Sequence, residues 1–386
     1  MAIAEQTRET GFQVKSHSSL PGNWPSGKDE TDVHCHIFQT REFVQSWEES
    51  YGKTGKHKAM FVEVLGEDGS LWLQIPFCIE TRGRLRVLTF LDQGHADYNC
   101  PIFYPTAPVW TNDSAAELWL QIMEILPGFD IAHLEKIAPG YKEFENPLFL
   151  ISDVNSAEFC HGNDLKKSWQ EIEATQFNLK TLKRYGRRLQ ELGETRLEIA
   201  RTQPEGQEML ERLIIQKQRR FEETLVPTFK ENPTALVFLD QATRNFGNSG
   251  NLFLVSLFVG DTQAASTWSL SHRGCLYSLI MGFEDGVYRK YSSGRILNLK
   301  LLQWLKDNGY EYLDHGFGDE DYKVKSCDTT IQLKEALIPI TNSGKLFLFK
   351  KNVMARLRST GIWQKFRPYK WKVINKLREI SSKRAN

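Results

Sequence analysis

Hydrophobic and polar positions follow two periods along the first half of the chain. Phe43, Val44, Trp47 and Tyr51 fall on one face of a helix that starts after Thr40. Alternating or continuous apolar runs between turn residues predict strands. The predicted strands are KAMFVEVLGE, SLWLQIPFCIE, RLRVLTFL, IAHLEKI and NPLFLI, and a second predicted helix is SAAELWLQIMEIL, capped by Ser114 or Asp113.

The same series of elements begins again in the second half. RLEIA predicts a strand, and two helices follow it, EGQEMLERLIIQKQRRFEET and TALVFLDQATRNF. Strands are then predicted at LFLVSLFVG, QAASTWSLSH, CLYSLIMGF, EYLDHG and QLKEALIPI, with the helix GRILNLKLLQWLKDNG among them. We interpret this as a repeat of architecture, with helices packed against a mostly antiparallel mixed sheet in an α/β (α+β) fold.

These patterns divide the chain into five predicted segments. They are a loose lead-in at 1–33, a first domain at 34–162, a basic linker helix at 163–193, a second domain at 194–344 and a basic aromatic tail at 345–386.

Composition favours a water-soluble protein of the cytoplasm. Hydrophobic residues make up 40% of the 386 and charged residues 25%, and the six cysteines are scattered singly. The N-terminus has no apolar signal segment, and LFLVSLFVG is too short to span a bilayer. The net charge of +1 hides an asymmetry, because residues 345–386 contain thirteen Lys or Arg and one Glu, or +12, which leaves −11 for residues 1–344.

One helix has a start that suits an anion. Tyr291, Ser292, Ser293 and Gly294 follow an apolar strand and precede a helix that ends at Gly309. Free backbone N–H groups and the helix dipole attract phosphate at such a start, and Arg295 adds positive charge. The alternative is structural: Ser293 is an ordinary N-cap and Gly294 an ordinary turn residue.

Several stretches together resemble the GNAT acyltransferase superfamily, and more specifically its tandem-GNAT group of cellulose-biosynthesis (CelD/BcsL-like) acetyltransferases, which are related to FemAB-type transferases. The resemblance covers about residues 37–330. It is carried by FQTREFVQSWEESYG, LWLQIPFCIETRGRLRVLTFLDQGHADYNCPIF, LKTLKRYGRRLQELGE, AASTWSL and SSGRILNLKLLQWLKDNGYEYLDHGFGDEDYK. The sequence departs from the group's pattern at Ser293, where many members have Pro, and in the run DHGFGDE, which lacks the usual Arg.

The resemblance implies two tandem GNAT-like domains and an acyl-CoA co-substrate such as acetyl-CoA, held by the second domain. Its pyrophosphate is expected at Ser292, Ser293, Gly294, Arg295 and Ile296. Its pantetheine arm is expected along Leu279, Ile280, Met281 and Gly282.

Direct acyl transfer needs a base for the attacking amine or hydroxyl. The candidates are His315, Asp314 and Glu320, with Asp319 beside them; a surface-turn histidine and a turn-capping aspartate are the structural alternatives. Acceptor contacts are predicted at Trp268, Asp97, Tyr98, Tyr322 and Lys323, although Trp268 is equally explained as a core residue and the last two as partners of nearby acids.

No metal is expected. His34, Cys35 and His36 are consecutive, so their side chains do not converge in a strand, and no second cluster has zinc spacing. The basic helix with Lys180, Lys183, Arg184, Arg187 and Arg188 is either a solvated surface or a contact for a phosphorylated partner.

Three functions remain open. The first is an acyltransferase acting on a sugar or related metabolite in polysaccharide biosynthesis, the second an aminoacyl-tRNA-dependent transferase, and the third a catalytically silent subunit of a polysaccharide-assembly complex.

The tail interleaves aromatic residues with Lys and Arg, and Pro368 divides it into two short helices. Such a tail suits an anionic membrane face or an acidic carrier protein, and nucleic acid less well; alternatively it packs on its own domain.

Overall fold

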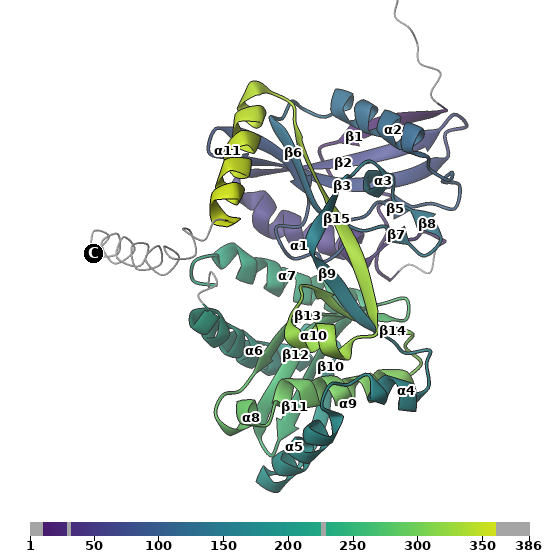
Figure 1. The fold of residues 1–386 in the computed structure, drawn as a ribbon. Coiled ribbons are helices and arrows are strands. Elements are labelled where there is room, and N and C mark those ends of the chain that lie inside the picture. Colours follow the sequence, from purple (N-terminus) through teal and green to yellow (C-terminus); the bar gives the residue numbers. More distant parts are fainter. Residues whose placement is uncertain (1–10, 29–31, 225–228, 360–386) are drawn as a thin grey trace, which may run out of the picture.

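The described residues form one 13-stranded sheet with two arms of similar pattern, in which β5 pairs with β3 outside the main path. Figure 1 shows the two arms with the long strands β9 and β15 between them. The computed structural model describes residues 11–28, 32–224 and 229–359. One arm of the sheet has the order β1 (Phe12–His17), β2 (His57–Gly66), β3 (Leu71–Arg82), β4 (Leu85–Phe90) and β6 (Ile131–Ile137). The other has β10 (Thr195–Ala200), β11 (Leu252–Val259), β12 (Thr262–His272), β13 (Cys275–Phe283) and β14 (Tyr312–Phe317). This symmetry confirms the predicted repeat.

Two long strands join the arms by exchange. β9 (Val154–Asp164) follows the first arm in sequence but pairs with β14 of the second. β15 (Thr329–Pro339) follows the second arm but pairs with β6 of the first, and β9 and β15 pair with each other. The strand that follows the first arm in sequence thus completes the sheet of the second arm, and the strand that follows the second arm completes the sheet of the first. The predicted limits 34–162 and 194–344 cut across these pairings.

Helices cover both arms. α1 (Arg41–Ser50) and α2 (Asn112–Ile125) belong to the first arm, and α6 (Gln203–Thr224), α7 (Pro233–Ser249) and α9 (Ser293–Asp307) to the second. α1 packs against α7 across the junction of the arms, with Phe43 and Phe238 in edge contact. The remaining helices are α3 (Pro147–Leu150), α4 (Trp169–Ala174), α5 (Leu179–Leu192), α8 (Val287–Lys290), α10 (Asp321–Ser326) and α11 (Asn342–Ser359), and the minor elements are β5 (Ile102–Phe103), β7 (Gly140–Tyr141), β8 (Phe144–Glu145), η1 (Ile37–Gln39) and η2 (Tyr51–Thr54).

Four local predictions need correction. The lead-in contains β1, which pairs along its length with β2. NPLFLI is helix α3, because Asn146 caps it and Pro147 suits the first helical position. Thr111 caps α2 through a capping box with Ser114. The segment 163–193 begins in β9 and then forms two helices, interrupted where Asn178 takes a left-handed conformation, φ 57°.

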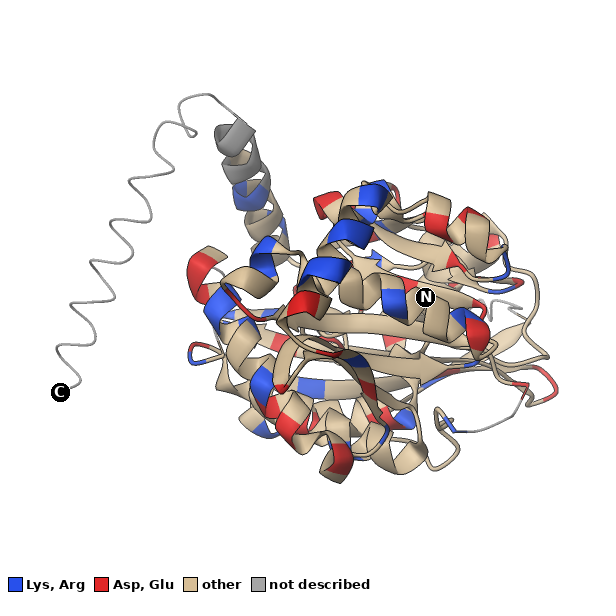
Figure 2. Cartoon of the chain, turned by 90° about the horizontal axis from the view of Figure 1, so that it is seen from below, with Lys and Arg blue, Asp and Glu red and all other residues tan. Residues whose placement is uncertain are grey.

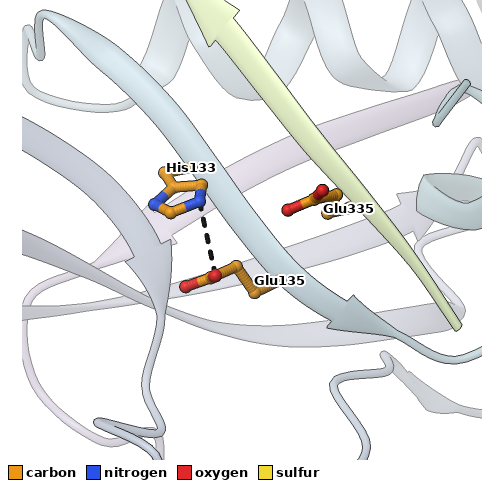
Figure 3. Close-up of side chains that lie close together, drawn as sticks. All are labelled: His133, Glu135 and Glu335. Atoms are coloured by element: carbon orange, nitrogen blue, oxygen red, sulfur yellow. Dashed lines mark ion pairs between the residues drawn. The ribbon is translucent and has the colours of Figure 1, made fainter. Parts of the chain in front are cut away.

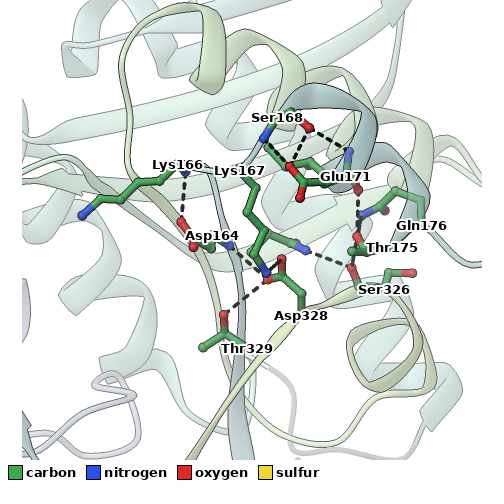
Figure 4. Close-up of polar contacts among 12 residues, drawn as sticks. Asp164, Lys166, Lys167, Ser168, Glu171, Thr175, Gln176, Ser326, Asp328 and Thr329 are labelled. Carbon is green, nitrogen blue, oxygen red and sulfur yellow. Dashed lines mark hydrogen bonds and ion pairs between the residues drawn. The ribbon is translucent and has the colours of Figure 1, made fainter.

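A polar network fixes the segments on both sides of α4 to the turn between α10 and β15 (Figure 4). The Ser326 carbonyl accepts hydrogen bonds from the side chains of Asn163 (2.9 Å), Thr175 (3.2 Å) and Gln176 (3.1 Å). The Asp328 carboxylate binds Lys167 Nζ at 2.7 Å. These contacts hold the turn between α10 and β15 in place, which matters because that turn borders the site described below.

Two hydrophobic cores stabilise the fold. The larger one extends from the first arm through α1 and α7 to Trp268 and Tyr277 of the second. The smaller one packs α5 and α9 on the other face of the second arm, with Leu182, Leu297 and Leu301 fully buried. The described residues include no helix that is both long and apolar enough to cross a membrane.

Candidate active site

The site begins where two parallel strands separate. β13 and β14 pair only through Cys275–Tyr312, Leu276–Leu313 and Tyr277–Asp314. Just beyond, β13 has a bulge, because Trp268 and Ser269 of β12 face Ile280 and Ser278 and leave Leu279 unpaired. The separated part of β13 therefore exposes backbone on its free side, and a cavity lies at each end of it.

The first cavity has a volume of about 210 Å³ and lies at the start of α9. Met281, Phe283, Ser292, Gly294 and Tyr322 line it together with Ser293, Arg289, Arg295 and Asn298. Ser292 is in the left-handed conformation, φ 55°, and no side chain caps the helix. The Ser293 hydroxyl donates instead to the Ala264 carbonyl at 2.9 Å, so Ser293 is not the N-cap of the structural alternative.

The other residues that were predicted to bind the acyl donor do not all line the first cavity. Ile296 is buried in the smaller core. The Arg295 guanidinium donates to the Phe177 carbonyl and lies over the Phe177 ring, so its side chain also ties α9 to the loop between α4 and α5. Leu279 and Ile280 face the second cavity, and Gly282 packs closely against Gln216 of α6.

The first cavity continues as a narrow extension that ends at His315. Gln176, Arg295, Asn298, His315 and Tyr322 line it with Ser326 and Cys327. His315 Nε2 lies 3.1 Å from Asn163 Oδ1, whereas His315 Nδ1 and Asn298 Oδ1 are buried without a partner. Such atoms are free to bond a ligand. Asn298 was missed in the sequence, where its only signal is a polar residue within an apolar helix face.

Burial makes His315 a poor base. Desolvation, with the charge of Lys323, lowers the pKa of His315 to about 3, so its ring stays neutral and holds a proton weakly. Its burial therefore favours a role for His315 as a hydrogen-bonding group rather than as a proton acceptor.

The second cavity, about 80 Å³, lies between the two halves. Asp97, Trp268, Leu279, Ile280 and Phe238 line it, with Phe43, Gly94, His95, Leu239 and Leu270. Trp268 is buried and donates its Nε1–H to Thr243 Oγ1 at 3.0 Å, so it forms a fixed wall. Asp97 is the carboxylate of this cavity. The predicted pair Trp268 and Asp97 is thus brought together from different halves of the chain.

A second carboxylate, Asp314, interacts electrostatically with Asp97 of this cavity. Burial raises the pKa of Asp97, partly offset by the charges of Lys136 and Lys323. Burial also raises the pKa of Asp314 to about 7, and the charge of Asp97 adds to the increase. Asp314 accepts a hydrogen bond from the Tyr98 hydroxyl at 2.5 Å; both residues are buried, and neither is among the residues that line the cavity.

The run DHGFGDE forms a tight turn around Asp97. Gly316 has φ 74°, and a Cβ there would lie 2.2 Å from Asp97 Oδ2. Lys323 is buried and donates to the Phe317 carbonyl at 2.9 Å, which closes the turn. Glu320 is exposed and pairs with Lys323 at 2.8 Å, while Asp319 pairs with His161 at 2.8 Å. Glu320 therefore lies away from both cavities, and Tyr322 lies on the first cavity rather than the second.

Comparison with known proteins gives a match in the second half of the chain. Residues 177–324 match the model of the acetyltransferase (GNAT) domain. Comparison with curated proteins gave no match.

Solved structures are similar over most of the chain. The crystal structure of FemX is 10% identical and covers 83% of this chain and 96% of its own, with a TM-score of 0.55, which shows a shared fold. L-PGS from Bacillus licheniformis is 13% identical, covering 81% and 96%, with a TM-score of 0.46. A tandem GNAT protein from the clavulanic acid biosynthesis pathway is 9% identical, covering 86% and 100%, with a TM-score of 0.41. Residues 177–324 thus match a GNAT acetyltransferase domain, which supports an acyltransferase, and most of the chain shares its fold with FemX.

Proposed function

We propose that the protein transfers an acyl group from a CoA-type thioester in the first cavity to an amine or hydroxyl acceptor in the second. The observation that carries the proposal is the position of the two cavities along the separated part of β13: Met281 lines one, and Leu279 and Ile280 line the other. A donor whose phosphates lie at the uncapped start of α9 then extends along β13 toward the acceptor.

The chemistry follows from the groups at the junction. The acceptor's nitrogen or oxygen attacks the thioester carbonyl, the C–S bond breaks, and the thiolate leaves. Asp97 is positioned to take the acceptor's proton, because it is the carboxylate of the acceptor cavity and burial raises its pKa. The bulge at Leu279 supplies unpaired backbone that can stabilise the oxyanion.

For the acceptor we propose a sugar or a related metabolite of polysaccharide biosynthesis. Support comes from the sequence resemblance to cellulose-biosynthesis acetyltransferases. The second cavity, mostly apolar with one carboxylate and about 80 Å³, admits only the reacting end of such a molecule.

Calorimetry with acetyl-CoA, followed by mass spectrometry of amino sugars incubated with enzyme and donor, tests the proposal. We expect one donor to bind per chain and the acceptor to gain an acetyl group. A chain that binds no acyl-CoA would instead favour the silent subunit or the aminoacyl-tRNA-dependent transferase.

The aminoacyl-tRNA alternative has one observation of its own, a basic surface on α5. Lys180, Arg184 and Arg187 are exposed and form no ion pair among the described residues. α5 lies beside the donor cavity, since the rings of Tyr185 and Tyr291 are 5.6 Å apart. Figure 2 views the molecule from this end and shows Lys and Arg on the helices facing the viewer.

Neutralising this surface distinguishes the two donors. If the donor is a tRNA, we expect the Lys180→Ala, Arg184→Ala, Arg187→Ala triple variant to weaken its binding and to reduce the dependence of affinity on salt, because fewer phosphates are neutralised. The matched control replaces Lys183 and Arg188, which already pair with Glu173 and Glu191. Titrations at several salt concentrations give the measurement, and equal slopes in all three proteins would exclude tRNA contact by α5.

We further propose that the basic tail holds the enzyme at an anionic membrane face. Residues 360–386, with Pro368 and the two predicted short helices, lie outside the described residues; residues 342–359 form α11, which packs on β15. A chain ending at Ser359 should stay folded and bind acyl-CoA but lose co-sedimentation with anionic vesicles, which high salt should also weaken in the full chain. Unchanged sedimentation after truncation would contradict this role.

A further inference from the structure

The first half of the molecule has its own separated strand pair. β4 and β6 are parallel at Val87–Ile131 and Leu88–Ala132 and then diverge, as β13 and β14 do. A cavity of about 290 Å³ lies there. In the strand order, β4 and β6 of the first arm correspond to β13 and β14 of the second. This cavity therefore corresponds in position to the region beside β13 where we propose that the acyl donor binds.

The chemistry of this cavity is opposite to that of the donor cavity. Glu80, Asp92 and Glu135 line it, and Glu335 approaches from β15. Arg82 also lines it and pairs with Glu80 at 2.8 Å, which leaves the other carboxylates in excess. α2, which precedes β6 in the chain as α9 precedes β14, has a capped start with Asp113 in its first turn, whereas the start of α9 is uncapped and has no acidic residue. Acidic groups repel phosphate, so this half is not a second acyl-donor site but one that suits a cation.

Three groups in it have the arrangement of metal ligands. One ligand atom each from His133, Glu135 and Glu335 lies within 4.8 Å of the others (Figure 3). His133 and Glu135 are two residues apart on β6, so their side chains share a face. A bulge on β6 places Glu135 and Lys136, which has φ 53°, opposite Glu335 of β15. All three ligands therefore come from paired strands rather than loops.

The surroundings leave these groups available. His133 is 8% exposed, and its Nε2 lies 3.5 Å from Glu135 Oε1. Its Nδ1 has no hydrogen-bond partner. Neither Glu135 nor Glu335 has an ion pair with a Lys or Arg among the described residues. Lys351 of α11, an exposed residue, donates from Nζ to His133 Nε2 at 3.2 Å and is the cation nearest this histidine.

We propose that His133, Glu135 and Glu335 form a site for a divalent transition-metal ion, and that the ion displaces the Lys351 ammonium from His133. An imidazole with two carboxylates suits Zn²⁺ or Mn²⁺ better than Mg²⁺, which prefers oxygen ligands alone. The ion would join β6 to the exchanged strand β15 and so stabilise the pairing between the halves. This site is independent of the acyl-transfer chemistry proposed above.

The test uses the full chain, without an affinity tag and freed of metal by chelation. We expect one equivalent of Zn²⁺ or Mn²⁺ to bind by calorimetry and to raise the thermal unfolding temperature, because an ion that binds only the folded chain stabilises it. Mg²⁺ should have little effect. His133→Ala and Glu335→Gln should each weaken binding by about 10-fold or more. Lys351→Met, which removes the competing charge, should tighten it.

A matched control is His17→Ala, which removes a histidine that pairs with a single carboxylate, Glu63, at 2.9 Å. It should bind metal like the wild type. Binding that persists in His133→Ala would place the ion elsewhere and overturn the proposal. So would the absence of binding in both the wild type and Lys351→Met when circular dichroism shows both folded, because the cluster would then serve only to hold Lys351.

Discussion

Asp97→Asn should lower the turnover number by roughly 10²–10⁴-fold, the usual cost of losing a general base, while leaving acyl-CoA binding unchanged. The substitution keeps the shape of the side chain beside Gly316 and removes only its ability to take a proton. Asp97 is the carboxylate of the acceptor cavity, and burial raises its pKa. Steady-state kinetics with calorimetry of donor binding separate the two effects.

The pH dependence of kcat/KM in the wild type gives a second test of Asp97 as the base. Because the pKa of Asp97 is raised, its carboxyl loses its proton at a higher pH than usual, and kcat/KM should rise with pH until ionisation is complete. Asp97→Asn should lack this rise. If Asp97→Asn retains full turnover while Asp314→Asn loses it, the base is Asp314.

Asp314 should make the free energy of unfolding depend on pH. Its folded pKa of about 7 lies above its ordinary value of 3.8, so the folded protein binds more protons between these values. Its contribution to the free energy of unfolding therefore falls as pH rises through this window and levels off above about pH 7. Asp314→Asn should remove that slope in denaturant unfolding measured at pH 5 and pH 8.

Gly294→Val should weaken acyl-CoA binding by roughly 100-fold, or about 2.7 kcal/mol, while leaving the fold intact. Gly294 lines the donor cavity in the first turn of α9, where a glycine lets backbone approach phosphate closely. A Cβ at this position meets Met281 Sδ at 3.4 Å and Phe283 Cδ1 at 3.5 Å, which are ordinary contacts. The two further methyl groups of valine must therefore extend into the cavity.

Gly294→Ala is the matched control for this prediction. Alanine adds only the tolerated Cβ and favours the helix by about 1 kcal/mol, so the variant should be at least as stable as the wild type. Its loss of donor affinity should lie between those of the wild type and the valine variant. Wild-type affinity in Gly294→Val, measured by calorimetry on protein with an unchanged unfolding transition, would place the donor elsewhere.

Local patterns predicted much of the second arm and the uncapped helix start that borders the first cavity. The apolar face of α9 with Leu297 and Leu301, its end at Gly309 with φ 76°, and the bare start at Ser292 all follow from side-chain spacing and from the steric freedom of glycine. These are properties of consecutive residues, so the sequence by itself determined them, along with the repeated order of helices and strands.

The tertiary structure decided which strands pair and which charged groups meet. No local pattern shows that β9 and β15 exchange between the halves, because a strand's period of two fixes its faces but not its partner. That exchange places Glu335 beside His133, and the contact between halves places Asp97 against Gly316. The pKa values of Asp97, Asp314 and His315 depend on burial by distant segments, so only the fold shows that Asp97 lines the second cavity and His315 the extension of the first.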